Sequence, residues 1–367
     1  MSRDGLEILG TRGIPAKHGG FETAAEYLSR YLVAKGWQVR VYCQLDGALN
    51  VRTRIWEDVE LVEISVPFGG AVSTIIFDAI SLILALRSGG QLLTFGYASA
   101  FLWFFPKLLG RFHVVNMDGI EWQRSQFGRI GRFWYRINEK VGCSLADLVV
   151  ADHPEIQKHL ERTRKCQDKL VMIPYGCHKI NEADDQILSR FGVERRKYFL
   201  VIARPEIDNS ILEIVQAFVS KRRGSKLLIL GKYSPDTNPY HRQIIETATE
   251  DVLFPGAVYE KNVTTALRFF ALAYVHGHIV GGTNPSLLES IGAGSAIVAH
   301  RNKFNRWVAG SAAIYFESVD ELSAVFANLE DKEDLVRELE HYSTIRRNQF
   351  TWDSVCKDYE RTLKTKA

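Results

Sequence analysis

The chain has 367 residues, of which 46% are hydrophobic and 24% are charged, and its net charge is +3. At about 100–200 residues per domain, this length predicts two domains, each large enough to bury its own core. The composition excludes a disordered chain, a collagen-like fibre and an acidic tail protein, and the net charge is too small to indicate nucleic-acid binding.

Cysteine usage and the longest apolar stretch indicate a cytoplasmic protein. The five cysteines lie far apart and form no CxxC pair, which predicts neither a zinc ribbon nor a redox dithiol. An odd, scattered set is typical of reduced thiols in a cytoplasm. The apolar stretch 71–86 is interrupted by Asp78 and falls short of the roughly 20 residues that span a bilayer, so it is interpreted as a buried helix. The first residues contain no signal-peptide core.

Short apolar runs alternate with helical patterns in the first half of the chain. The run Leu6–Leu9 predicts a strand, and a glycine-rich loop follows it. Apolar residues at spacings of three and four then predict a helix over 22–35, which ends at Gly36. Further predicted strands cover 39–43, 61–66, 92–94, 114–116 and 148–151.

The same alternation restarts in the second half, after a turn marked by Pro174 and Gly176. Strands that alternate with helices predict parallel sheets covered on both faces. We therefore expect an α/β fold of two doubly wound, Rossmann-like domains facing across a cleft, with ligands at the carboxyl ends of strands. The predicted strands here are 198–203, 226–230, 252–254, 272–275 and 296–299, and the predicted helices are 210–221, 264–270 and 285–292.

The loop over residues 10–22 joins the first predicted strand to the first helix. It holds four glycines, a proline and three cations. Glycines let the backbone approach a ligand closely, and the amides of a helix N-terminus favour an anion such as a phosphate. The alternative is a strand–helix loop with no ligand. Its spacing is neither GxGxxG nor a Walker A sequence.

A second glycine-rich loop lies within residues 276–289, again between a strand and a helix. Thr283 or Asn284 can cap this helix, and Pro285 suits its first turn. Several amides of the loop would suit a pyrophosphate. Glu289 lies one turn inside the helix, where a carboxylate can take two ribose hydroxyls. The alternative is a capped helix with a solvated glutamate.

Two further polar side chains directly follow predicted strands. Arg204 is placed where a guanidinium could neutralise a leaving diphosphate, and the alternative is a surface arginine paired with Glu206 or Asp208. Asp118 precedes a glycine and should face the cleft of the first domain. A carboxylate there could orient or deprotonate an acceptor hydroxyl, and the alternative is an Asp-Gly turn that only caps a helix.

Basic and aromatic residues interleave over 122–140. The cations Arg129, Arg132 and Arg136 lie among aromatic residues that include Trp134. Cations with interleaved aromatics suit an anionic membrane surface. The alternative is a half-buried helix whose aromatics belong to the core. Nucleic acid would need a larger basic excess than this chain has.

Together these motifs resemble the bacterial glycosyltransferases of family 4, a retaining family with the GT-B fold. Within it they resemble the branch of β-1,4-rhamnosyltransferases of capsule and cell-wall polysaccharide synthesis. The resemblance implies an acceptor-binding domain over 1–175, a nucleotide-sugar donor-binding domain over 180–345, and a C-terminal helix over 346–367 that packs back onto the first domain. The matching runs are 10–23, 116–122 and 276–289.

The resemblance also implies a role for each candidate residue. Asp118 would sit near the acceptor or the transferred sugar and Arg204 would hold the diphosphate, which makes both catalytic. Two positions depart from the family pattern: Gly281 stands where a glutamate is usual, and Asn209 where a lysine is usual. The implied donor-binding residues are Gly19, Gly20, Arg204, Asn209, Gly231, Tyr259, Gly281, Gly282, Thr283, Asn284 and Glu289.

The implied donor is dTDP-β-L-rhamnose, and the implied acceptor is a lipid-diphosphate-linked saccharide. Such an acceptor places the protein on the inner face of the cell membrane, with Arg129, Arg132, Trp134 and Arg136 facing the lipid. No metal site is expected, because the sequence offers no clustered acidic motif. One alternative is transfer of another hexose from UDP or GDP, and a second is a non-catalytic nucleotide-sugar-binding subunit. A nicotinamide oxidoreductase is disfavoured by the spacing of the first loop.

Overall fold

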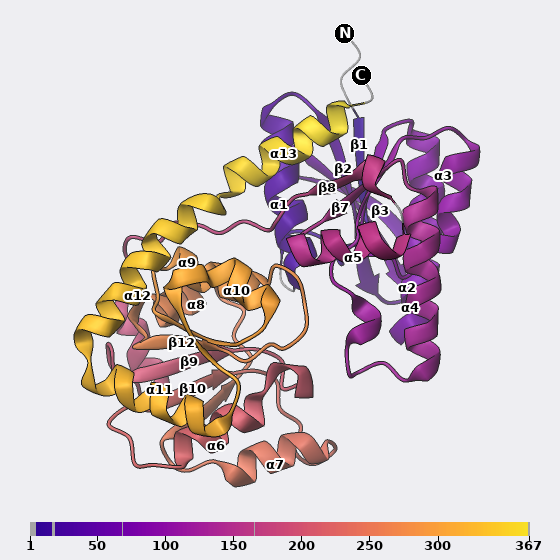
Figure 1. Ribbon diagram of the computed structural model, residues 1–367. Coiled ribbons are helices and arrows are strands. Elements are labelled where there is room, and N and C mark those ends of the chain that lie inside the picture. Colours follow the sequence, from indigo (N-terminus) through magenta and orange to yellow (C-terminus); the bar gives the residue numbers. More distant parts are fainter. Residues whose placement is uncertain (1–4, 17–18, 68, 165, 366–367) are drawn as a thin grey trace. The chain divides into compact units, whose positions relative to one another are not determined.

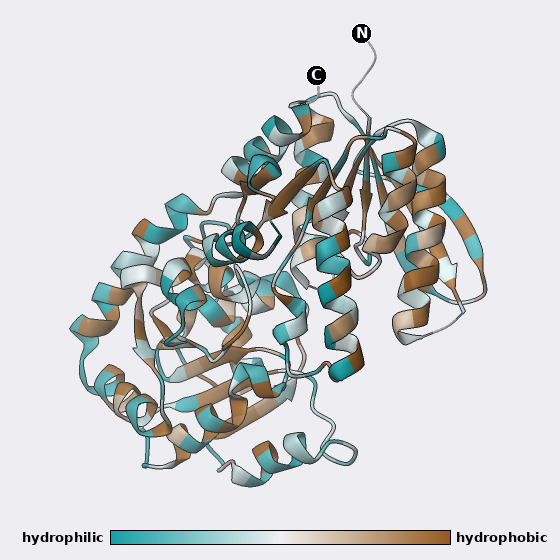
Figure 2. Cartoon of the chain, turned by 45° about the vertical axis from the view of Figure 1, so that its right-hand side comes forward, coloured by the Kyte–Doolittle hydropathy of each residue, from teal (hydrophilic) through white to brown (hydrophobic). Residues whose placement is uncertain are grey.

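The computed structural model describes residues 5–16, 19–67, 69–164 and 166–365. The chain divides into two compact units, and Figure 1 shows a sheet covered by helices in each of them. The first unit contains Met1–Gln123, Phe127–Gly176 and Trp352–Ala367, and the second contains Arg124–Gln126 and Cys177–Thr351. Figure 2 shows apolar strands inside each unit and helices with one polar side, as expected for buried parallel sheets.

The first unit is built on a sheet with the strand order β3-β4-β2-β1-β5-β6-β7-β8 among the described residues. Neighbouring strands are parallel except for β3, which runs antiparallel to β4. The strands are β1 Gly5–Leu9, β2 Gln38–Asp46, β3 Asn50–Trp56, β4 Val59–Val66, β5 Gln91–Phe95, β6 His113–Asn116, β7 Leu148–Ala151 and β8 Leu170–Met172.

The last helix of the chain belongs to the first unit. Trp352 stacks on Tyr27 of α1 with ring centroids 4.7 Å apart, and the Tyr31 hydroxyl donates to Glu360 at 3.0 Å. The returning helix begins at Trp352 rather than at 346, because residues 346–351 lie in the second unit. The helices of the first unit are α1 Gly19–Ala34, α2 Gly70–Ser88, α3 Phe104–Leu108, α4 Arg129–Leu145, α5 Pro154–Arg164 and α13 Trp352–Lys364, with short 3-10 helices η1 Ala100–Trp103, η2 Glu121–Gln123 and η3 Gln167–Lys169.

Helix α2 corrects the expectation of a buried helix over 71–86. It packs on β1 and β4 through one face, and Phe77 and Leu82 belong to the core of the unit. Its other face is exposed, including Val72 and Ile83. Among the described residues α2 is the one helix long and apolar enough to cross a membrane, which is weak evidence because helices of globular cores pass the same test.

The second unit has a parallel sheet with the order β11-β10-β9-β12-β13-β14 among the described residues. Its core includes the contacting rings of Phe199, Phe218 and Phe326. Full burial of each such side chain contributes about 1.5–3 kcal/mol to folding. The strands are β9 Tyr198–Ile202, β10 Lys226–Leu230, β11 Val252–Gly256, β12 Ala273–His276, β13 Ile297–His300 and β14 Ala313–Phe316.

The helices of the second unit cover both faces of its sheet (Figure 1). They are α6 Ile211–Val219, α7 Pro239–Thr247, α8 Lys261–Phe270, α9 Pro285–Gly292, α10 Lys303–Ala309, α11 Val319–Asp331 and α12 Glu333–Arg346, with 3-10 helices η4 Asp185–Phe191, η5 Ile207–Asn209, η6 Gly310–Ala312 and η7 Arg347–Gln349. Every strand predicted from the sequence is present in one of the two sheets. The sequence missed β3, β8 and β14.

Candidate functional site

Two loops of the second unit meet at the carboxyl ends of the neighbouring strands β9 and β12. The Ile279 N–H in the second loop donates to the Asp208 carbonyl in the first at 2.9 Å. A Cβ at Gly277 would lie 2.3 Å from the Asn209 carbonyl oxygen, so the loops pack this closely only with glycine there. The structure thus brings the Arg204–Asn209 loop and the glycine run after β12 together, at the edge where parallel sheets bind ligands.

Arg204 is exposed at the end of β9. Among the described residues its guanidinium has no ion pair with Glu206 or Asp208, and Asp208 instead accepts a hydrogen bond from the Ser125 N–H at 2.8 Å. The alternative of a paired surface arginine is therefore wrong. The buried amide of Asn209 donates to the Arg204 carbonyl at 2.7 Å. Asn209 therefore holds the backbone of Arg204 and supplies no charge of its own.

The predicted cap of helix α9 is confirmed. Asn284 is the N-cap, its side chain accepts from the Ser286 N–H at 2.9 Å, and Pro285 opens the helix. Thr283 is buried, whereas Gly281 and Gly282 are partly exposed. Gly281 has φ +151°, and a Cβ built on it would meet no atom within 4 Å. The helix N-terminus therefore presents backbone amides beside open space, which favours an anion.

Glu289 is paired with a residue that the sequence analysis missed. Its carboxylate lies 2.6 Å from the guanidinium of Arg268 on α8, and the two side chains are 43% and 6% exposed. The alternative of a solvated glutamate is therefore only partly correct, because the carboxylate is paired with Arg268 while part of it still faces solvent. An arginine at a core-facing position of α8, beside Leu267 and Phe270, was the available signal for Arg268.

His276 and His278 form a stacked pair, with ring centroids 4.2 Å apart and planes 6° apart. Burial lowers the pKa of both rings, and for His278, with a further contribution from the charges of Arg124 and Arg204, the pKa falls to about 3. Both rings are therefore neutral near pH 7. Among the described residues no three His, Cys, Asp or Glu side chains gather as ligands for a metal ion.

Two of the implied donor-binding residues, Gly231 and Tyr259, lie on separate loops. Gly231 follows β10, and a Cβ there would lie 2.6 Å from the Ala203 carbonyl oxygen and 3.4 Å from the Tyr233 ring. This close approach places Gly231 beside the Arg204 loop. Tyr259 precedes α8 and is largely exposed. The structure thus gives Tyr259 a surface position.

In the first unit, carboxylates of α1 hold the glycine-rich loop. Glu22 and Glu26 are buried and accept from the N–H groups of Arg12 at 2.9 Å and Ala16 at 2.6 Å, so these two amides are already used. Helix α1 begins at Gly19, three residues before the expected start. Gly19 is exposed in the first turn with φ +73°, and Gly20 is partly exposed. Lys17 and His18 lie outside the described residues.

Asp118 follows β6 in a left-handed conformation, with φ +51°. Its N–H donates to Asn116 Oδ1 at 2.8 Å, and Asn116 Nδ2 donates to the Tyr359 hydroxyl of α13 at 2.7 Å. Asp118 also lines a cavity of about 180 Å³ in the first unit. The C-terminal helix therefore takes part in fixing the Asp118 turn, which no local sequence pattern indicates.

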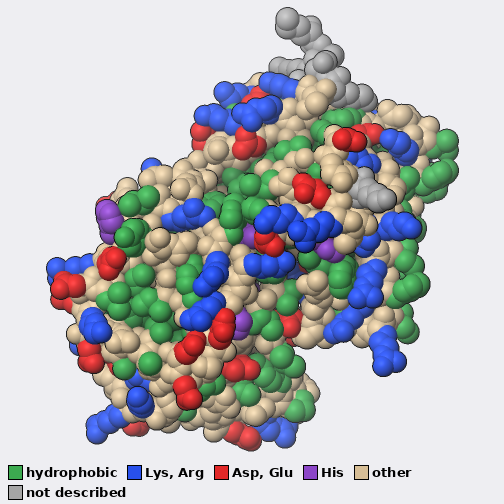
Figure 3. Space-filling view, viewed as in Figure 1, with side chains coloured by type: hydrophobic (Ala, Val, Ile, Leu, Met, Phe, Trp, Pro, Cys, Tyr) green, Lys and Arg blue, Asp and Glu red, His purple; other side chains and the backbone are tan. Residues whose placement is uncertain are grey.

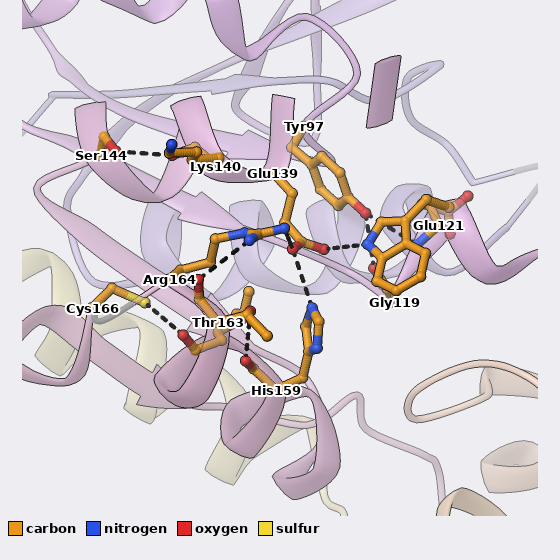
Figure 4. Close-up of polar contacts among 12 residues, drawn as sticks. Tyr97, Gly119, Glu121, Glu139, Lys140, Ser144, His159, Thr163, Arg164 and Cys166 are labelled. Carbon is orange, nitrogen blue, oxygen red and sulfur yellow. Dashed lines mark hydrogen bonds and ion pairs between the residues drawn. The ribbon is translucent and has the colours of Figure 1, made fainter. Parts of the chain in front are cut away.

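A buried polar cluster holds the segment after Asp118 (Figure 4). The Tyr97 hydroxyl donates to the Gly119 carbonyl at 3.3 Å and accepts from the Glu121 N–H at 3.0 Å. The Trp122 indole N–H donates to Glu139 on α4 at 3.0 Å. The same carboxylate contacts His159 at 3.1 Å and Arg164 at 2.5 Å. Burial alone would raise the pKa of Glu139, but these partners together hold it below its ordinary value.

Helix α4 turns an apolar stripe toward solvent. Ile130, Phe133, Trp134 and Ile137 follow one another at spacings of three and four, and Phe133 and Trp134 are 66% and 39% exposed. The alternative that its aromatics belong to the core is therefore wrong for these two rings. Arg129, Arg132 and Arg136 are exposed on the same helix, and Arg136 stacks over Trp122 at 4.3 Å. Figure 3 shows basic side chains over α4 and apolar ones over α3.

Comparison with known proteins identifies the fold. Residues 4–178 match a family described as a domain of unknown function, DUF1972, and no curated protein matches. Sucrose-phosphate synthase from Thermosynechococcus elongatus is similar in structure, with TM-score 0.81, 15% identity and coverage of 98% of both chains.

Two other solved structures are similar at comparable identity. An α,α-trehalose-phosphate synthase (UDP-forming) from Burkholderia xenovorans, in complex with glucose-6-phosphate, has TM-score 0.73 at 13% identity and covers 98% of this chain and 99% of its own. WaaG, a glycosyltransferase involved in lipopolysaccharide biosynthesis, has TM-score 0.73 at 13% identity and covers 98% of this chain and 100% of its own. With two helix-covered sheets that are parallel except for β3, and with these neighbours, the chain has the GT-B fold of glycosyltransferases.

Proposed function

We propose that the protein is a retaining glycosyltransferase that moves L-rhamnose from dTDP-β-L-rhamnose to a lipid-linked saccharide in the synthesis of a bacterial surface polysaccharide. The observation that carries the transferase is the exposed Arg204 guanidinium, which has no ion pair among the described residues and belongs to a loop that packs against the loop leading into α9. The GT-B fold supports a hexose donor linked to a nucleotide. The rhamnosyl donor and the lipid acceptor rest on the motif resemblance.

In this proposal the leaving diphosphate and the attacking acceptor are on the same face of the sugar ring. The bond from C1 to the diphosphate oxygen breaks, and a bond from C1 to the acceptor oxygen forms on the same side, which keeps the anomeric configuration. The acceptor proton passes to the leaving diphosphate. Arg204 and the amides of the glycine run stabilise the charge that develops on the diphosphate, so the proposal includes no metal ion. Asp118 orients the acceptor hydroxyl.

A thermal-shift experiment with the purified protein tests the donor. A ligand that binds only the native state raises the unfolding midpoint. We expect dTDP and dTDP-rhamnose to raise Tm more than UDP-, GDP- or ADP-sugars do at equal concentration. A larger Tm shift with UDP or GDP sugars would mean that the donor is one of those sugars, and the protein would still be proposed as a transferase. A Tm unchanged by every nucleotide and sugar nucleotide would contradict the proposal.

Loss of Glu289 should weaken nucleotide binding. In Glu289→Ala we expect the Kd for dTDP, measured by calorimetry, to rise about ten- to a hundredfold, because a hydrogen bond to a charged group contributes about 1.5–3 kcal/mol. Glu260→Ala is the matched control, since Glu260 is an exposed partner of Arg190 in the same unit. An unchanged Kd in Glu289→Ala would mean that the carboxylate only neutralises Arg268.

We also propose that α3 and α4 hold the protein on the anionic inner face of the cell membrane. The apolar stripe of α4 continues onto η1, because Trp134 contacts Phe101 with ring centroids 5.6 Å apart. Phe104, Phe105 and Leu108 of α3 add exposed apolar area. An exposed apolar stripe flanked by arginines suits a surface of anionic lipid.

Charge reversal on α4 tests this membrane surface. In Arg129→Glu/Arg132→Glu we expect binding to vesicles with anionic lipid to fall about thirtyfold or more, since each basic residue near such a surface contributes about 1 kcal/mol. Lys357→Glu/Arg361→Glu on α13 changes the net charge equally at two exposed positions and is the control. Equal sedimentation of the two variants with vesicles would contradict the membrane surface.

A non-catalytic nucleotide-sugar-binding subunit is the second candidate. It is favoured by Gly281, which places no carboxylate in the loop before α9, and by Asn209, whose amide is used on the backbone. Such a subunit would bind dTDP-rhamnose without releasing dTDP in the presence of lipid-linked acceptor. Release of dTDP that depends on the acceptor would exclude it.

A further inference from the structure

The cavity beside Asp118 is the size of one sugar ring. It lies at the carboxyl ends of β1, β5 and β6, and its volume is about 180 Å³. A space of this size is large enough for a single pyranose, and a longer saccharide would extend out of it.

The lining of the cavity suits an uncharged polyhydroxylated ligand. Among the described residues that line it, none is Lys, Arg or His, whereas carboxyls, hydroxyls and aromatic rings are all present. Carboxyls accept hydrogen bonds from sugar hydroxyls and repel an anion, and rings pack against the apolar side of a sugar. The residues with these groups are Asp78, Asp118, Glu121, Thr74, Ser81, Thr94, Ser99, Phe21, Phe95, Tyr97, Trp103 and Tyr135.

Two arginines line a separate hollow, together with three carboxyls. This second space has a volume of about 440 Å³ and is lined by Arg12 and Arg54 as well as by Glu22, Asp46 and Glu63, while Thr74 lines both spaces. Arg54 is already paired with Glu63 at 2.6 Å. The ring-sized cavity therefore has no cation of its own among the described residues.

Asp78 stands out because of the helix that carries it. It is the only charged residue between Gly70 and Leu86 on the apolar helix α2. Thr74, Asp78 and Ser81 lie at spacings of four and three, so they form one polar stripe, and all three line the cavity. An apolar helix gains no stability from a carboxyl at such a position, which indicates a role in binding.

Ser99 lies beside Asp78 in the wall of the cavity. Its side chain lines the cavity and is buried, with 4% exposure. Burial raises the pKa of the Asp78 carboxyl to about 6, although its interaction with the Ser99 hydroxyl lowers it. The two side chains therefore offer a ligand a carboxyl and a hydroxyl side by side.

We propose that this cavity binds one uncharged pyranose of the acceptor, and that Asp78 together with Ser99 determines which arrangement of hydroxyls it accepts. The assignment of this pyranose to the acceptor rests on the proposed transferase function, whereas the preference for an uncharged sugar rests on the lining of the cavity alone. No Lys, Arg or His among the described lining residues would pair with the phosphate of a sugar phosphate.

Sugar binding without any nucleotide tests the inference. We would titrate the full chain with methyl glycosides of neutral hexoses and 6-deoxyhexoses, and with glucose-6-phosphate and glucuronic acid. Ligand-observed NMR would detect binding, and tryptophan fluorescence would report on Trp103 in the cavity wall. The variants are Asp78→Leu and Asp78→Asn, and Ile83→Ala at an exposed position of the same helix is the control.

We expect at least one neutral glycoside to bind at least tenfold more tightly than either anionic sugar. Asp78→Leu should lower its affinity at least tenfold, Asp78→Asn should change the order of preference among neutral glycosides, and Ile83→Ala should change neither. If Asp78→Leu does not fold, the inference is tested by whether Asp78→Asn changes the order of preference among neutral glycosides. Tighter binding of glucose-6-phosphate, unchanged binding in the Asp78 variants, or no neutral glycoside bound would each overturn the inference. A failed dTDP shift would instead contradict the transferase alone.

Discussion

Replacing Arg204 with alanine should lower kcat by about two to three orders of magnitude, the range seen when one donor to a developing negative charge is removed. The guanidinium is exposed, makes no ion pair among the described residues, and lies in a loop that packs against the loop leading into α9. Charge builds on the diphosphate mainly as the C1–oxygen bond breaks, so kcat should fall more than dTDP affinity. The assay is release of dTDP from dTDP-rhamnose with a lipid-linked acceptor.

Arg190→Ala is the matched control for Arg204, because Arg190 is an exposed arginine of the same unit with a weak partner 3.5 Å away. Arg204→Lys should keep part of the rate, since lysine restores the charge but not the planar pair of donors. A kcat in Arg204→Ala equal to that of Arg190→Ala would remove Arg204 from the mechanism.

Replacing Glu139 with alanine should have the largest effect on stability. Breaking a buried pair costs about 3–5 kcal/mol because the partner charge stays buried, and for a unit of this size that lowers Tm by about 6–20 °C. Glu139 is 1% exposed, and its loss leaves Arg164, His159 and the Trp122 indole N–H without their acceptor. Differential scanning calorimetry of the full chain measures the change.

The same variant should lose activity, since Trp122 and Tyr97 hold the segment that follows Asp118. Glu139→Gln keeps an acceptor for the indole and should recover much of the activity while remaining less stable. Glu155→Ala, at an exposed ion pair with Lys158 on α5, controls for a general loss of charge. A Tm of Glu139→Ala within 2 °C of the Glu155→Ala value, a shift worth about 1 kcal/mol at most, would contradict the structural role.

Lowering the pH should also reduce the stability that Glu139 contributes to the folded chain. The pKa of Glu139 is held below its ordinary value of 4.5 in the folded chain. A carboxyl with a depressed pKa stabilises the fold fully above its unfolded pKa, and this contribution is lost as the pH falls through the folded value. Wild-type protein should therefore lose stability more steeply below pH 4.5 than Glu139→Gln does, in urea titrations at several pH values.

Local patterns were enough for most of the two sheets. Buried parallel strands such as 198–202 and 226–230 are continuous apolar runs between turn residues, and such runs are visible without any partner strand. The strand β3 was missed because neither of its faces is buried, so its sequence is not a continuous apolar run. It carries exposed Arg52 and Arg54, which pair with Glu63 across the hairpin, and it is joined to β4 by Glu57 and Asp58 with positive φ.

Helix boundaries and surface helices were less predictable. The helix α2 is a continuous apolar run, and no periodicity in it distinguishes a buried helix from one that exposes half of its surface. The helix α4 reads as amphipathic, but the apolar stripe over its first turns faces outward, while Asn138, Glu139 and Gly142 face the core. Which side of an amphipathic helix is buried depends on neighbours that lie far away in the sequence.

The residues of the candidate site also divide into those that the sequence indicated and those that only the structure showed. Arg204 and Asp118 follow strands, Asn284 caps a helix and Glu289 lies one turn inside that helix, so adjacent residues alone pointed to them. The residues that contact them could not be predicted from adjacent residues. Arg268 beside Glu289, Asn116 and Tyr359 beside Asp118, and the cluster around Glu139 come from other elements, because hydrogen bonds between distant segments leave no period in the sequence.

Residue order along the chain thus establishes two doubly wound sheets, the loops at their carboxyl ends, and the polar residues that those loops carry. Packing in three dimensions assigns the rest: Asn209 acts on the Arg204 backbone, Asp78 faces a cavity without cations among its described lining residues, and the α4 aromatics face solvent. The physical reason is that propensity and periodicity act within a few residues, whereas burial and charge pairing depend on which surfaces meet after the chain has folded.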